Sequence, residues 1–355
     1  MRLQGRISLL EKAAKIRKLY EKILKNFSSI YVNNYSFVFV CQDGIVRVTL
    51  ATMKAIYCYV CRAKNRRILY RKGKYSIFKC LSCGFIYTDP IPSKVQLEEF
   101  YKNFDYKNKE IAELTIRKDA MNSLKRIRQY IKNEQVKLLD IGCGRGFFLD
   151  EARKLGWNVY GIDYSENVID YAIKKLNLDV ERTDMFNYHT KELYDVVSLN
   201  QVIEHVSDPD KIIKKCFKLL KKGGILYIAT PNIGSISAKV LGSDFDHLIP
   251  PEHLGYFDKN LLIRSLKDND FSVQYLGSWS YSVDLAGIIK KLLYKNKHSI
   301  ETPMNKSMDS VGSSNQSRVK QIKYFLFDKF FCGIFYKVLN LDSFGIMLDA
   351  VAIKK

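Results

Sequence analysis

The stretch Leu138–Phe148, LLDIGCGRGFF, places an aspartate and three alternate glycines directly after a short apolar run. Glycines in such a turn let backbone N–H groups approach a ligand closely, with the N-terminus of the next helix behind them. The spacing is G-x-G-x-G, at Gly142, Gly144 and Gly146, and not the G-x-G-x-x-G of dinucleotide-binding folds. The loop also lacks the Gly-Lys-Ser/Thr ending of a Walker loop. Phosphate binding is therefore disfavoured.

From about residue 136 the chain alternates between apolar runs and amphipathic segments. We predict strands at VKLLDIG, WNVYGID, YDVVSLN and ILYIATP, with a closing strand at FGIMLDAVAIKK. Helices are predicted at GFFLDEARKLG, SENVIDYAIKKLN and SDPDKIIKKCFKLLKKGG, where Gly156 and the pair Gly223 and Gly224 are interpreted as helix ends. This alternation predicts an α/β fold, a doubly wound and mostly parallel sheet.

Two further carboxylates follow strands of this region. Asp163 ends the second strand, where a carboxylate can accept hydrogen bonds from both hydroxyls of a ribose. Asp184 follows the presumed third strand, LDVERTD, and suits an adenine amino group, although a role in a turn is the alternative. A loop without phosphate chemistry, a ribose carboxylate and an adenine contact describe a nucleoside without pyrophosphate. S-adenosylmethionine fits that description.

Four blocks, LLDIGCGRGFFL, VYGIDYSENVIDYA, YDVVSLNQVIEHVSDP and LKKGGILYIATPN, resemble the class I S-adenosylmethionine-dependent methyltransferases, of the type 11/23-like kind. The resemblance covers roughly residues 136 to 271 and implies a Rossmann-like sheet of seven strands. It further implies that Asp140 and the loop glycines contact the methionine portion, that Asp163 holds the ribose, and that Asn200 and Gln201 line the cofactor floor. The full implied cofactor set is Asp140, Gly142, Cys143, Gly144, Gly146, Asp163, Tyr164, Asp184, Met185, Asn200 and Gln201.

Methyl transfer to a hydroxyl group requires a base that removes the proton of the acceptor. Candidate catalytic residues are Glu204 and His205 just past the fourth strand, and His253 in IPPEHLGYF, beside Glu252 and near His247. A structural role for any one of them is the alternative. Ubiquinone-type O-methyltransferases, which this region resembles, use an E-x-x-E/D-H cluster for a divalent metal. Here Gln201 replaces the first carboxylate, so no magnesium site is predicted.

Eight cysteines include two Cys-x-x-Cys pairs, CYVC and CLSC, which are separated by 18 residues. This spacing is typical of a four-cysteine zinc ribbon, and free structural thiols are the alternative. Four thiolates leave no ligand position open, so we predict a structural zinc ion on Cys58, Cys61, Cys80 and Cys83. With DPIPSKVQLEEFYKNF, the ribbon resembles a zinc-binding domain found ahead of bacterial and archaeal methyltransferases, where substrate capture is a conceivable role.

The sequence suggests the following organisation. We predict a basic N-terminal extension (1–52), a zinc ribbon (53–92), a helical connector (93–134), the methyltransferase domain (135–290), a flexible insertion (295–320) and a C-terminal helix with the closing strand (321–355). No apolar run reaches the roughly 18 residues that span a bilayer, and no secretory signal is evident, so a cytoplasmic protein is expected.

The net charge of +21 is concentrated near the N-terminus, where residues 1–90 carry 18 Lys and Arg against 4 Asp and Glu. This bias suits nucleic acid, anionic lipid or a phosphorylated substrate, and a lysine-rich composition explains it equally well. Arg62, Lys64, Arg66 and Arg67 in the ribbon suit an anionic acceptor. The basic N-terminal helix and the aromatic segment 323–339 allow peripheral membrane contact, although packing on the catalytic domain is preferred.

Three functions follow in order of preference. The first is methyl transfer to a small-molecule or glycan acceptor (a sugar, polysaccharide or secondary-metabolite precursor), expected at oxygen. The second is a nucleic-acid methyltransferase that binds RNA through the ribbon and the basic N-terminus. NQVIEH, however, replaces the Asp/Asn-Pro-Pro-Tyr/Phe box of the amino-methylating enzymes. The third is a non-catalytic binding protein on the same fold. The oligomeric state is left open.

Overall fold

The computed structural model describes residues 57–93, 96–97, 109–280 and 345–355, together with the backbone of three strands near the N-terminus. The chain divides into two compact units, Met1–Tyr57 and Cys58–Lys355. In the first unit, β1 (Phe27–Asn33), β2 (Ser36–Cys41) and β3 (Gly44–Thr49) form an antiparallel sheet. The helix predicted within residues 1–30, the insertion at 295–320 and the aromatic segment 323–339 lie outside the described residues.

The second unit is built around a seven-stranded sheet with the strand order β13-β14-β11-β10-β7-β8-β9. The central strands β7, β8, β9, β10 and β11 pair in parallel, whereas β14 pairs antiparallel with both β11 and β13. The Rossmann-like, mostly parallel sheet predicted from the sequence is thereby confirmed. The strands are β7 (Lys137–Ile141), β8 (Asn158–Asp163), β9 (Val180–Arg182), β10 (Tyr194–Asn200), β11 (Leu220–Pro231), β13 (Phe271–Trp279) and β14 (Met347–Lys354).

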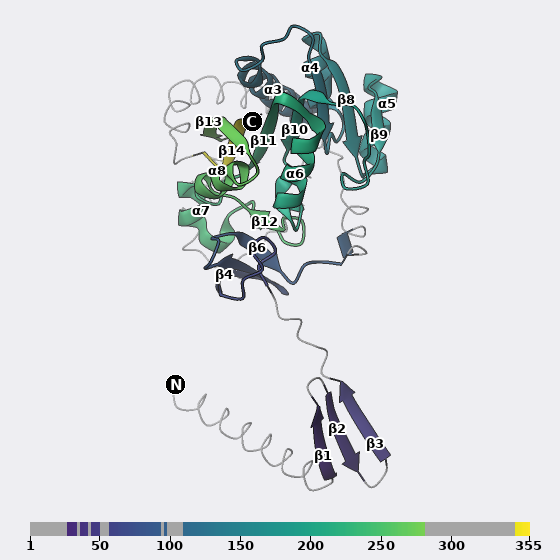
Figure 1. The fold of residues 1–355 in the computed structure, drawn as a ribbon, viewed down its shortest axis with the longest axis vertical. Coiled ribbons are helices and arrows are strands. Elements are labelled where there is room, and N and C mark those ends of the chain that lie inside the picture. Colours follow the sequence, from purple (N-terminus) through teal and green to yellow (C-terminus); the bar gives the residue numbers. More distant parts are fainter. Residues whose placement is uncertain are drawn as a thin grey trace, which may run out of the picture. The chain divides into compact units, whose positions relative to one another are not determined.

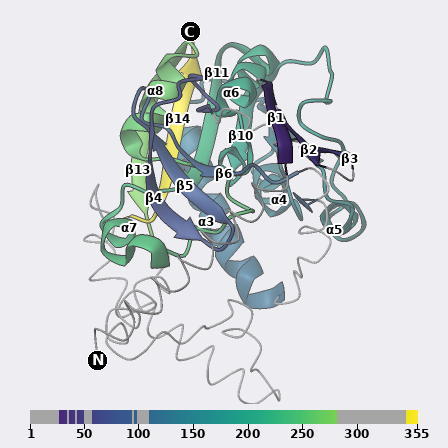
Figure 2. The ribbon, with the colours of Figure 1, turned by 90° about the horizontal axis from the view of Figure 1, so that it is seen from below.

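Helices cover both faces of this sheet (Figures 1 and 2). One buried cluster joins the strands to α3 (Lys109–Arg128), α4 (Phe147–Lys154) and α5 (Glu166–Leu176). A second cluster joins the opposite face to α6 (Pro209–Leu219) and α8 (Lys259–Lys267). Figure 1 shows α6 in front of the central strands. Strands buried on both faces explain why β7 and β10 are almost continuously apolar.

The glycines that were interpreted as helix ends behave differently from one another. Gly156 follows α4 with φ +81°, and its N–H donates to Arg153 O, so that helix end is confirmed. In contrast, α6 ends at Leu219, and both Gly223 and Gly224 lie inside β11. The β10–β11 register shifts beside them, and a Cβ on Gly224 would lie 2.9 Å from Lys221 O. These two glycines therefore serve a bulge in the strand.

Residues 58–93, which we call the four-cysteine module, form three antiparallel strands, β4 (Arg66–Lys72), β5 (Tyr75–Cys80) and β6 (Ile86–Asp89). The sheet of the module gains a fourth strand from the methyltransferase-like region, because β6 pairs with β12 (Gly255–Tyr256). The described part of this unit also contains the short helical segments η1 (Ile203–His205), α7 (Ile236–Leu241) and η2 (Gly242–Asp244). Within the described residues, no helix has the length and apolar character required to cross a membrane.

Candidate functional site

The glycine loop between β7 and α4 requires its three glycines. Gly142, Gly144 and Gly146 have φ angles of +74°, +53° and +81°, in the left-handed region that side chains disfavour. A Cβ on Gly142 would lie 2.5 Å from a methyl group of Val202, and one on Gly146 would lie 2.5 Å from Leu178. A Cβ on Gly144 would meet no atom within 4 Å, so this peptide faces open space. The loop is therefore packed at both ends and open in the middle.

Asp163, at the end of β8, holds the open part of this loop. Its carboxylate accepts hydrogen bonds from Gly144 N and Ser165 N, each at 2.8 Å. Burial raises the pKa of Asp163, and the N–H groups of Ser165 and Gly144 oppose that shift. The N–H group of Tyr164 also bonds to this carboxylate, so about one of its four acceptor positions remains for a ligand. The carboxylate thus joins the glycine loop to the second strand and still offers an acceptor to a ligand hydroxyl group.

Asp140 lies on β7 beneath the loop and is only 2% exposed. Its carboxylate accepts from Ser198 Oγ on the adjacent strand β10 at 2.6 Å. Burial raises the pKa of Asp140 to about 7, Ser198 lowers it, and the charge of Asp163 raises it further. A nearby ligand cation would stabilise the ionised carboxylate.

The remaining predicted cofactor residues lie at the carboxyl ends of the same strands. Tyr164 is 45% exposed beside Asp163, the buried Cys143 lies in the loop, Met185 packs against the core, and Asn200 ends β10. Gln201 adopts φ +55°, and its N–H donates to Ala229 O. Asp184 accepts from Phe186 N at 2.7 Å. This hydrogen bond matches the turn role that was the alternative to an adenine contact.

Sequence reasoning missed two residues that shape this part of the site. Ser198 is buried on β10 and donates to Asp140. Gly161 on β8 has no room for a side chain, because a Cβ would lie 2.5 Å from Leu149 and 2.8 Å from Cys143 Sγ. The glycine inside the predicted strand VYGID was a usable signal for such a close approach.

A second group of side chains gathers where β10 and β11 end. Glu204 and His205 lie on η1, and His253 lies 48 residues further along the chain, yet one ligand-type atom from each falls within 4.8 Å of the others. The imidazole centroids of His205 and His253 are 4.9 Å apart, and the ring of His247 stacks on His253 at 6.2 Å. Val202, just before η1, packs against Gly142. The acceptor-edge cluster, defined as Glu204, His205 and His253, therefore adjoins the glycine loop.

Backbone carbonyl groups fix the tautomers of both histidines. His205 Nδ1 lies 2.9 Å from Glu252 O, and His253 Nδ1 lies 2.8 Å from His247 O. A carbonyl oxygen only accepts, so each Nδ1 carries the proton and each Nε2 keeps the lone pair. Burial lowers the pKa of His205. Burial and the electrostatic effect of His205 lower the pKa of His253 well below its usual value. Both rings are thus neutral at pH 7.

Glu204 is the most buried member of the cluster, at 1% exposure. Its Oε2 accepts from Thr230 Oγ1 at 3.0 Å, whereas its buried Oε1 has no hydrogen-bond partner. Burial raises the pKa of Glu204 to about 8, against the opposing effect of its hydrogen bonds, and Glu252 raises it further. At pH 7 the carboxyl group is therefore largely protonated and can donate a hydrogen bond.

The cluster does not match the magnesium-binding pattern of ubiquinone-type enzymes. Gln201 supplies no carboxylate, and the side chains that gather are one carboxyl group and two imidazoles. Magnesium prefers oxygen ligands in near-octahedral geometry, so this donor set does not fit that ion.

Replacing Glu204 should make stability less dependent on pH. A carboxyl group whose folded pKa is raised contributes stability below its unfolded pKa, near 4.5, and loses it as pH rises through about 8. We expect Glu204→Gln to gain stability relative to wild type between about pH 5 and about pH 9, by on the order of a few kcal/mol. Urea unfolding at both pH values measures this gain.

The control for that experiment is Glu192→Gln, which removes an exposed carboxyl group at the opposite edge of the sheet. Because the Lys137 ammonium group lowers the pKa of Glu192, this variant should show no such gain above about pH 5. A Glu204→Gln difference that stays flat with pH would contradict the buried, protonated state of Glu204.

The four cysteines of the four-cysteine module converge on one point. Cys58 Sγ and Cys83 Sγ are 3.5 Å apart, as are Cys61 Sγ and Cys80 Sγ, and all four sulfur atoms lie within 4.8 Å of one another. Sulfur atoms on a tetrahedral zinc ion are about 3.8 Å apart, whereas a disulfide requires about 2 Å. The arrangement fits a tetrahedral metal ion.

Both cysteine pairs form the same turn. The N–H of the residue after each pair, Arg62 or Gly84, donates to the first cysteine carbonyl at 2.9 Å. Arg62 and Gly84 have φ angles of +60° and +76°. The second turn has the glycine expected there, and the first accommodates an arginine with a left-handed backbone. Hydrogen bonds within the two turns therefore place the four sulfur atoms close together without a bound metal ion.

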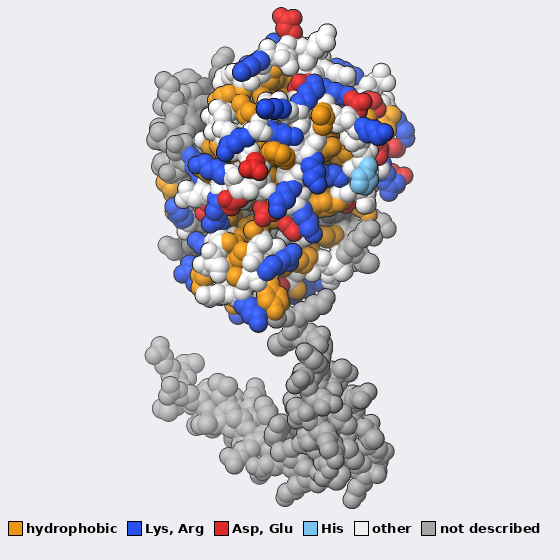
Figure 3. Space-filling view, in the orientation of Figure 1, with side chains coloured by type: hydrophobic (Ala, Val, Ile, Leu, Met, Phe, Trp, Pro, Cys, Tyr) orange, Lys and Arg blue, Asp and Glu red, His pale blue; other side chains and the backbone are white. Residues whose placement is uncertain are grey.

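Arg66 is already engaged within the protein. Its guanidinium group pairs with Asp89 at 2.8 Å and lies 3.7 Å from the ring centroid of Phe78. Arg62 lies 3.7 Å from Asp208. On the face seen in Figure 3, Lys and Arg side chains are interspersed with acidic and apolar ones. Arg66 therefore has a structural role, and binding of an anionic acceptor would have to share its guanidinium group with Asp89.

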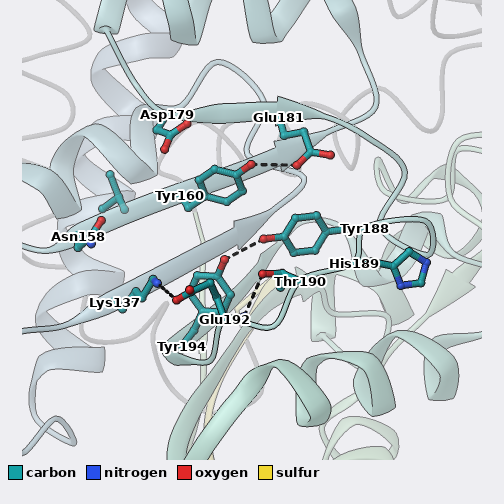
Figure 4. Close-up of a pocket in the computed structure, with 11 residues that line it drawn as sticks. Lys137, Asn158, Tyr160, Asp179, Glu181, Tyr188, His189, Thr190, Glu192 and Tyr194 are labelled. Atoms are coloured by element: carbon teal, nitrogen blue, oxygen red, sulfur yellow. Dashed lines mark hydrogen bonds and ion pairs between the residues drawn. The ribbon is translucent and has the colours of Figure 1, made fainter.

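A cleft of about 370 Å³ lies at the opposite end of the strands from the glycine loop, and Figure 4 shows the residues that line it. It is lined by Lys137, Asn158 and Tyr194, the first residues of β7, β8 and β10, and its tyrosine hydroxyl groups are paired. The glycine loop, Asp163 and the acceptor-edge cluster lie beyond the other ends of these strands. In doubly wound sheets, ligands bind at that carboxyl edge.

Comparison with known proteins identifies the family of this chain. Residues 112–276 match the family model described as a methyltransferase domain. Over 172 residues the chain is 32% identical to the ubiquinone biosynthesis O-methyltransferase of Pelagibacter ubique. The aligned stretch covers 42% of this chain and 71% of that relative. This protein is an S-adenosylmethionine-dependent methyltransferase. The prediction from the sequence that the cofactor is S-adenosylmethionine is therefore confirmed.

A second relative is matched over a smaller part of its length, and the fold is also found among solved structures. The ubiquinone biosynthesis O-methyltransferase of Coxiella burnetii is 36% identical over 116 residues, which are 31% of this chain and about half, 49%, of that relative. Among solved structures, a methyltransferase from Archaeoglobus fulgidus aligns with 67% of this chain and 94% of its own, at 22% identity and a TM-score of 0.42.

Removing the Asp163 carboxylate should weaken cofactor binding strongly. A hydrogen bond to a charged group contributes about 1.5–3 kcal/mol, so losing the ribose contacts that are predicted for Asp163 should weaken S-adenosylhomocysteine binding about a hundredfold. Calorimetric titration of wild type and Asp163→Ala measures this effect. Asp170→Ala, which removes an exposed aspartate on α5, is the matched control. Equal affinities for wild type and Asp163→Ala would remove Asp163 from the cofactor site.

Proposed function

We propose that this methyltransferase transfers the methyl group of S-adenosylmethionine to a hydroxyl oxygen of a small-molecule acceptor. The observation that supports this proposal is the acceptor-edge cluster, which adjoins the glycine loop and contains two neutral imidazoles. An amine acceptor needs no strong base once it is deprotonated, whereas a hydroxyl group does. The O-methyltransferase names of the relatives from P. ubique and C. burnetii point in the same direction.

In the proposed mechanism, the glycine loop and Asp163 would hold S-adenosylmethionine, which would supply the methyl group. The acceptor oxygen would form the new bond to the methyl carbon while the bond from that carbon to sulfur breaks, with S-adenosylhomocysteine as the leaving group. His205, the less buried of the two cluster histidines, accepts the acceptor proton at Nε2. His253 and the protonated Glu204 orient the acceptor and the ring of His205. Alignment and exclusion of water supply the rest of the acceleration.

The four-cysteine module is proposed to hold one structural zinc ion. Four thiolates at tetrahedral spacing leave no position for a substrate, so this ion has no part in the chemistry. Metal binding would supply much of the folding free energy of a segment this small. Cys58, Cys61, Cys80 and Cys83 are the proposed ligands.

An acceptor panel tests the proposed reaction. Purified protein is incubated with isotopically labelled S-adenosylmethionine and, separately, with catechol, a nucleotide sugar, histamine and bulk tRNA. We expect the label in a small hydroxyl compound, on oxygen, as located by mass spectrometry of the product. Label in histamine or tRNA, with none in the hydroxyl compounds, would contradict the proposal and would favour an amine or nucleic-acid acceptor.

A further inference from the structure

The four-cysteine module and the acceptor-edge cluster are joined by a shared sheet. Tyr87 and Ile86 of β6 pair with Gly255 and Tyr256 of β12, which begins two residues after His253. The aromatic rings of Phe85 and Phe257 pack beside this pairing, with centroids 5.8 Å apart. Segments that are far apart in the sequence thus form one continuous structure around His253.

Thr88 makes the central contacts of this junction. It is fully buried, its N–H donates to Leu254 O at 2.9 Å, and its hydroxyl group donates to His253 O at 2.8 Å. The same hydroxyl group lies 3.1 Å from the hydroxyl of Tyr256, which itself donates to His253 O at 3.2 Å. Two donors therefore fix the peptide plane that follows His253.

The other side of the same segment is held by η1. Leu254 N donates to Glu204 O at 2.7 Å, and His205 Nδ1 bonds to Glu252 O at 2.9 Å. The backbone of residues 252–254 thus lies between Thr88 and the two η1 members of the cluster. A shift of this backbone would move His253 relative to both Glu204 and His205.

Thr88 is connected in turn to the first cysteine pair. The hydroxyl group of Tyr59, which lies between Cys58 and Cys61, donates to Thr88 O at 3.1 Å. The rings of Tyr59 and Tyr87 pack with centroids 4.7 Å apart. Contiguous hydrogen bonds therefore run from a cysteine turn through Tyr59 and Thr88 to His253.

We propose that Thr88 is a positioning residue for His253, and that the four-cysteine module thereby forms one side of the acceptor site. This proposal rests on the proposed function, because it gives His253 a place in acceptor binding. The proposed cofactor site is formed by β7, β8 and the glycine loop, whereas the side-chain hydrogen bonds of Thr88 run to His253 and Tyr256. Loss of the Thr88 hydroxyl group should therefore impair turnover and leave cofactor affinity unchanged.

The test compares Thr88→Val, which removes the hydroxyl group at nearly constant shape, with Thr88→Ser, which retains it. Nitrogen-15 spectra of labelled histidine report on His253 without any acceptor, and the chain has only five histidines. We expect the His253 and His205 signals to move in Thr88→Val and to return in Thr88→Ser. Thr190→Val, a hydroxyl deletion at the opposite edge, should leave them in place.

Turnover of the hydroxyl acceptor provides a second readout. We expect kcat to fall about tenfold in Thr88→Val, because small misplacements of reacting groups cost large factors, with S-adenosylhomocysteine affinity within about twofold of wild type. In a His253→Ala background, Thr88→Val should cause no further loss, since the two residues act together. Additive losses would overturn the positioning role.

The spectra separate this proposal from the proposed function. Moved histidine signals in a wild type that methylates no hydroxyl compound would support the placement of His253 and refute only the proposed reaction. Unmoved signals in Thr88→Val would overturn the positioning role whatever the acceptor. If Thr88→Val does not fold, Tyr256→Phe removes the other donor to His253 O and is judged by the same criteria.

Discussion

His205→Ala should lower kcat about a thousandfold, because a positioned general base contributes about 10²–10⁴-fold to a proton-transfer step. The substitution removes the Nε2 acceptor and the hydrogen bond to Glu252 O, and it leaves the backbone hydrogen bond from Leu254 N to Glu204 O in the same segment. The affinity for S-adenosylhomocysteine should stay near the wild-type value. Single-turnover methyl transfer to the hydroxyl acceptor, followed by mass spectrometry, measures the effect.

The dependence of kcat on pH tests the same role of His205. Burial lowers the pKa of His205 below its ordinary value of 6.5, so the base stays neutral to a lower pH than an exposed imidazole does. Wild-type kcat should therefore fall on the acid side as His205 gains a proton, and that acid limb should vanish in His205→Ala. His189→Ala removes an exposed imidazole at the opposite edge and is the control. Equal losses in both variants, or an unchanged kcat in His205→Ala, would show that His205 is not the base.

Cys61→Ser should abolish zinc binding by the four-cysteine module. Cys61 is the exposed member of the four, so exchanging sulfur for oxygen removes one thiolate without opening a buried cavity. Structural zinc sites contribute about 10 kcal/mol or more to folding, so residues 58–93 should lose most of their protection from hydrogen exchange. We expect one zinc ion per wild-type chain by elemental analysis, and none in the variant.

Cys216→Ala is the matched control, because Cys216 is buried in α6 and lies outside the four-cysteine module. It should keep one zinc ion per chain. A second metal ion that disappears in His253→Ala would mean that the acceptor-edge cluster binds a cation, which would contradict the role of His205 as a base. Wild type without zinc, but with a folded module, would leave the cysteines as structural thiols.

Features with local causes could be predicted from the sequence. The three loop glycines are required by their own φ angles, and the two Cys-x-x-Cys turns by hydrogen bonds within a few residues. The alternation of apolar and amphipathic runs was enough to predict the parallel sheet. The place of Asp163 at the end of the second strand also follows directly from that alternation.

Features that depend on distant contacts could not be predicted in this way. Thr88 and His253 are 165 residues apart, and nothing near Thr88 indicates that its hydroxyl group holds a histidine carbonyl. The same holds for Thr230, which donates to Glu204. Gly223 and Gly224 were misinterpreted because a glycine pair after an amphipathic run suits a helix end as well as a bulge. The pairing of Leu220 with Tyr194 decides in favour of the strand.

The most direct test of the account is a crystal structure of the protein with S-adenosylhomocysteine. We predict ribose hydroxyl groups at Asp163, the homocysteine portion along Gly142–Gly146, and the sulfur atom directed toward Glu204, His205 and His253. A ligand bound in the cleft beside Tyr160 and Tyr188, or a sulfur atom directed away from the acceptor-edge cluster, would contradict the claim that cofactor and base share the carboxyl edge of the sheet.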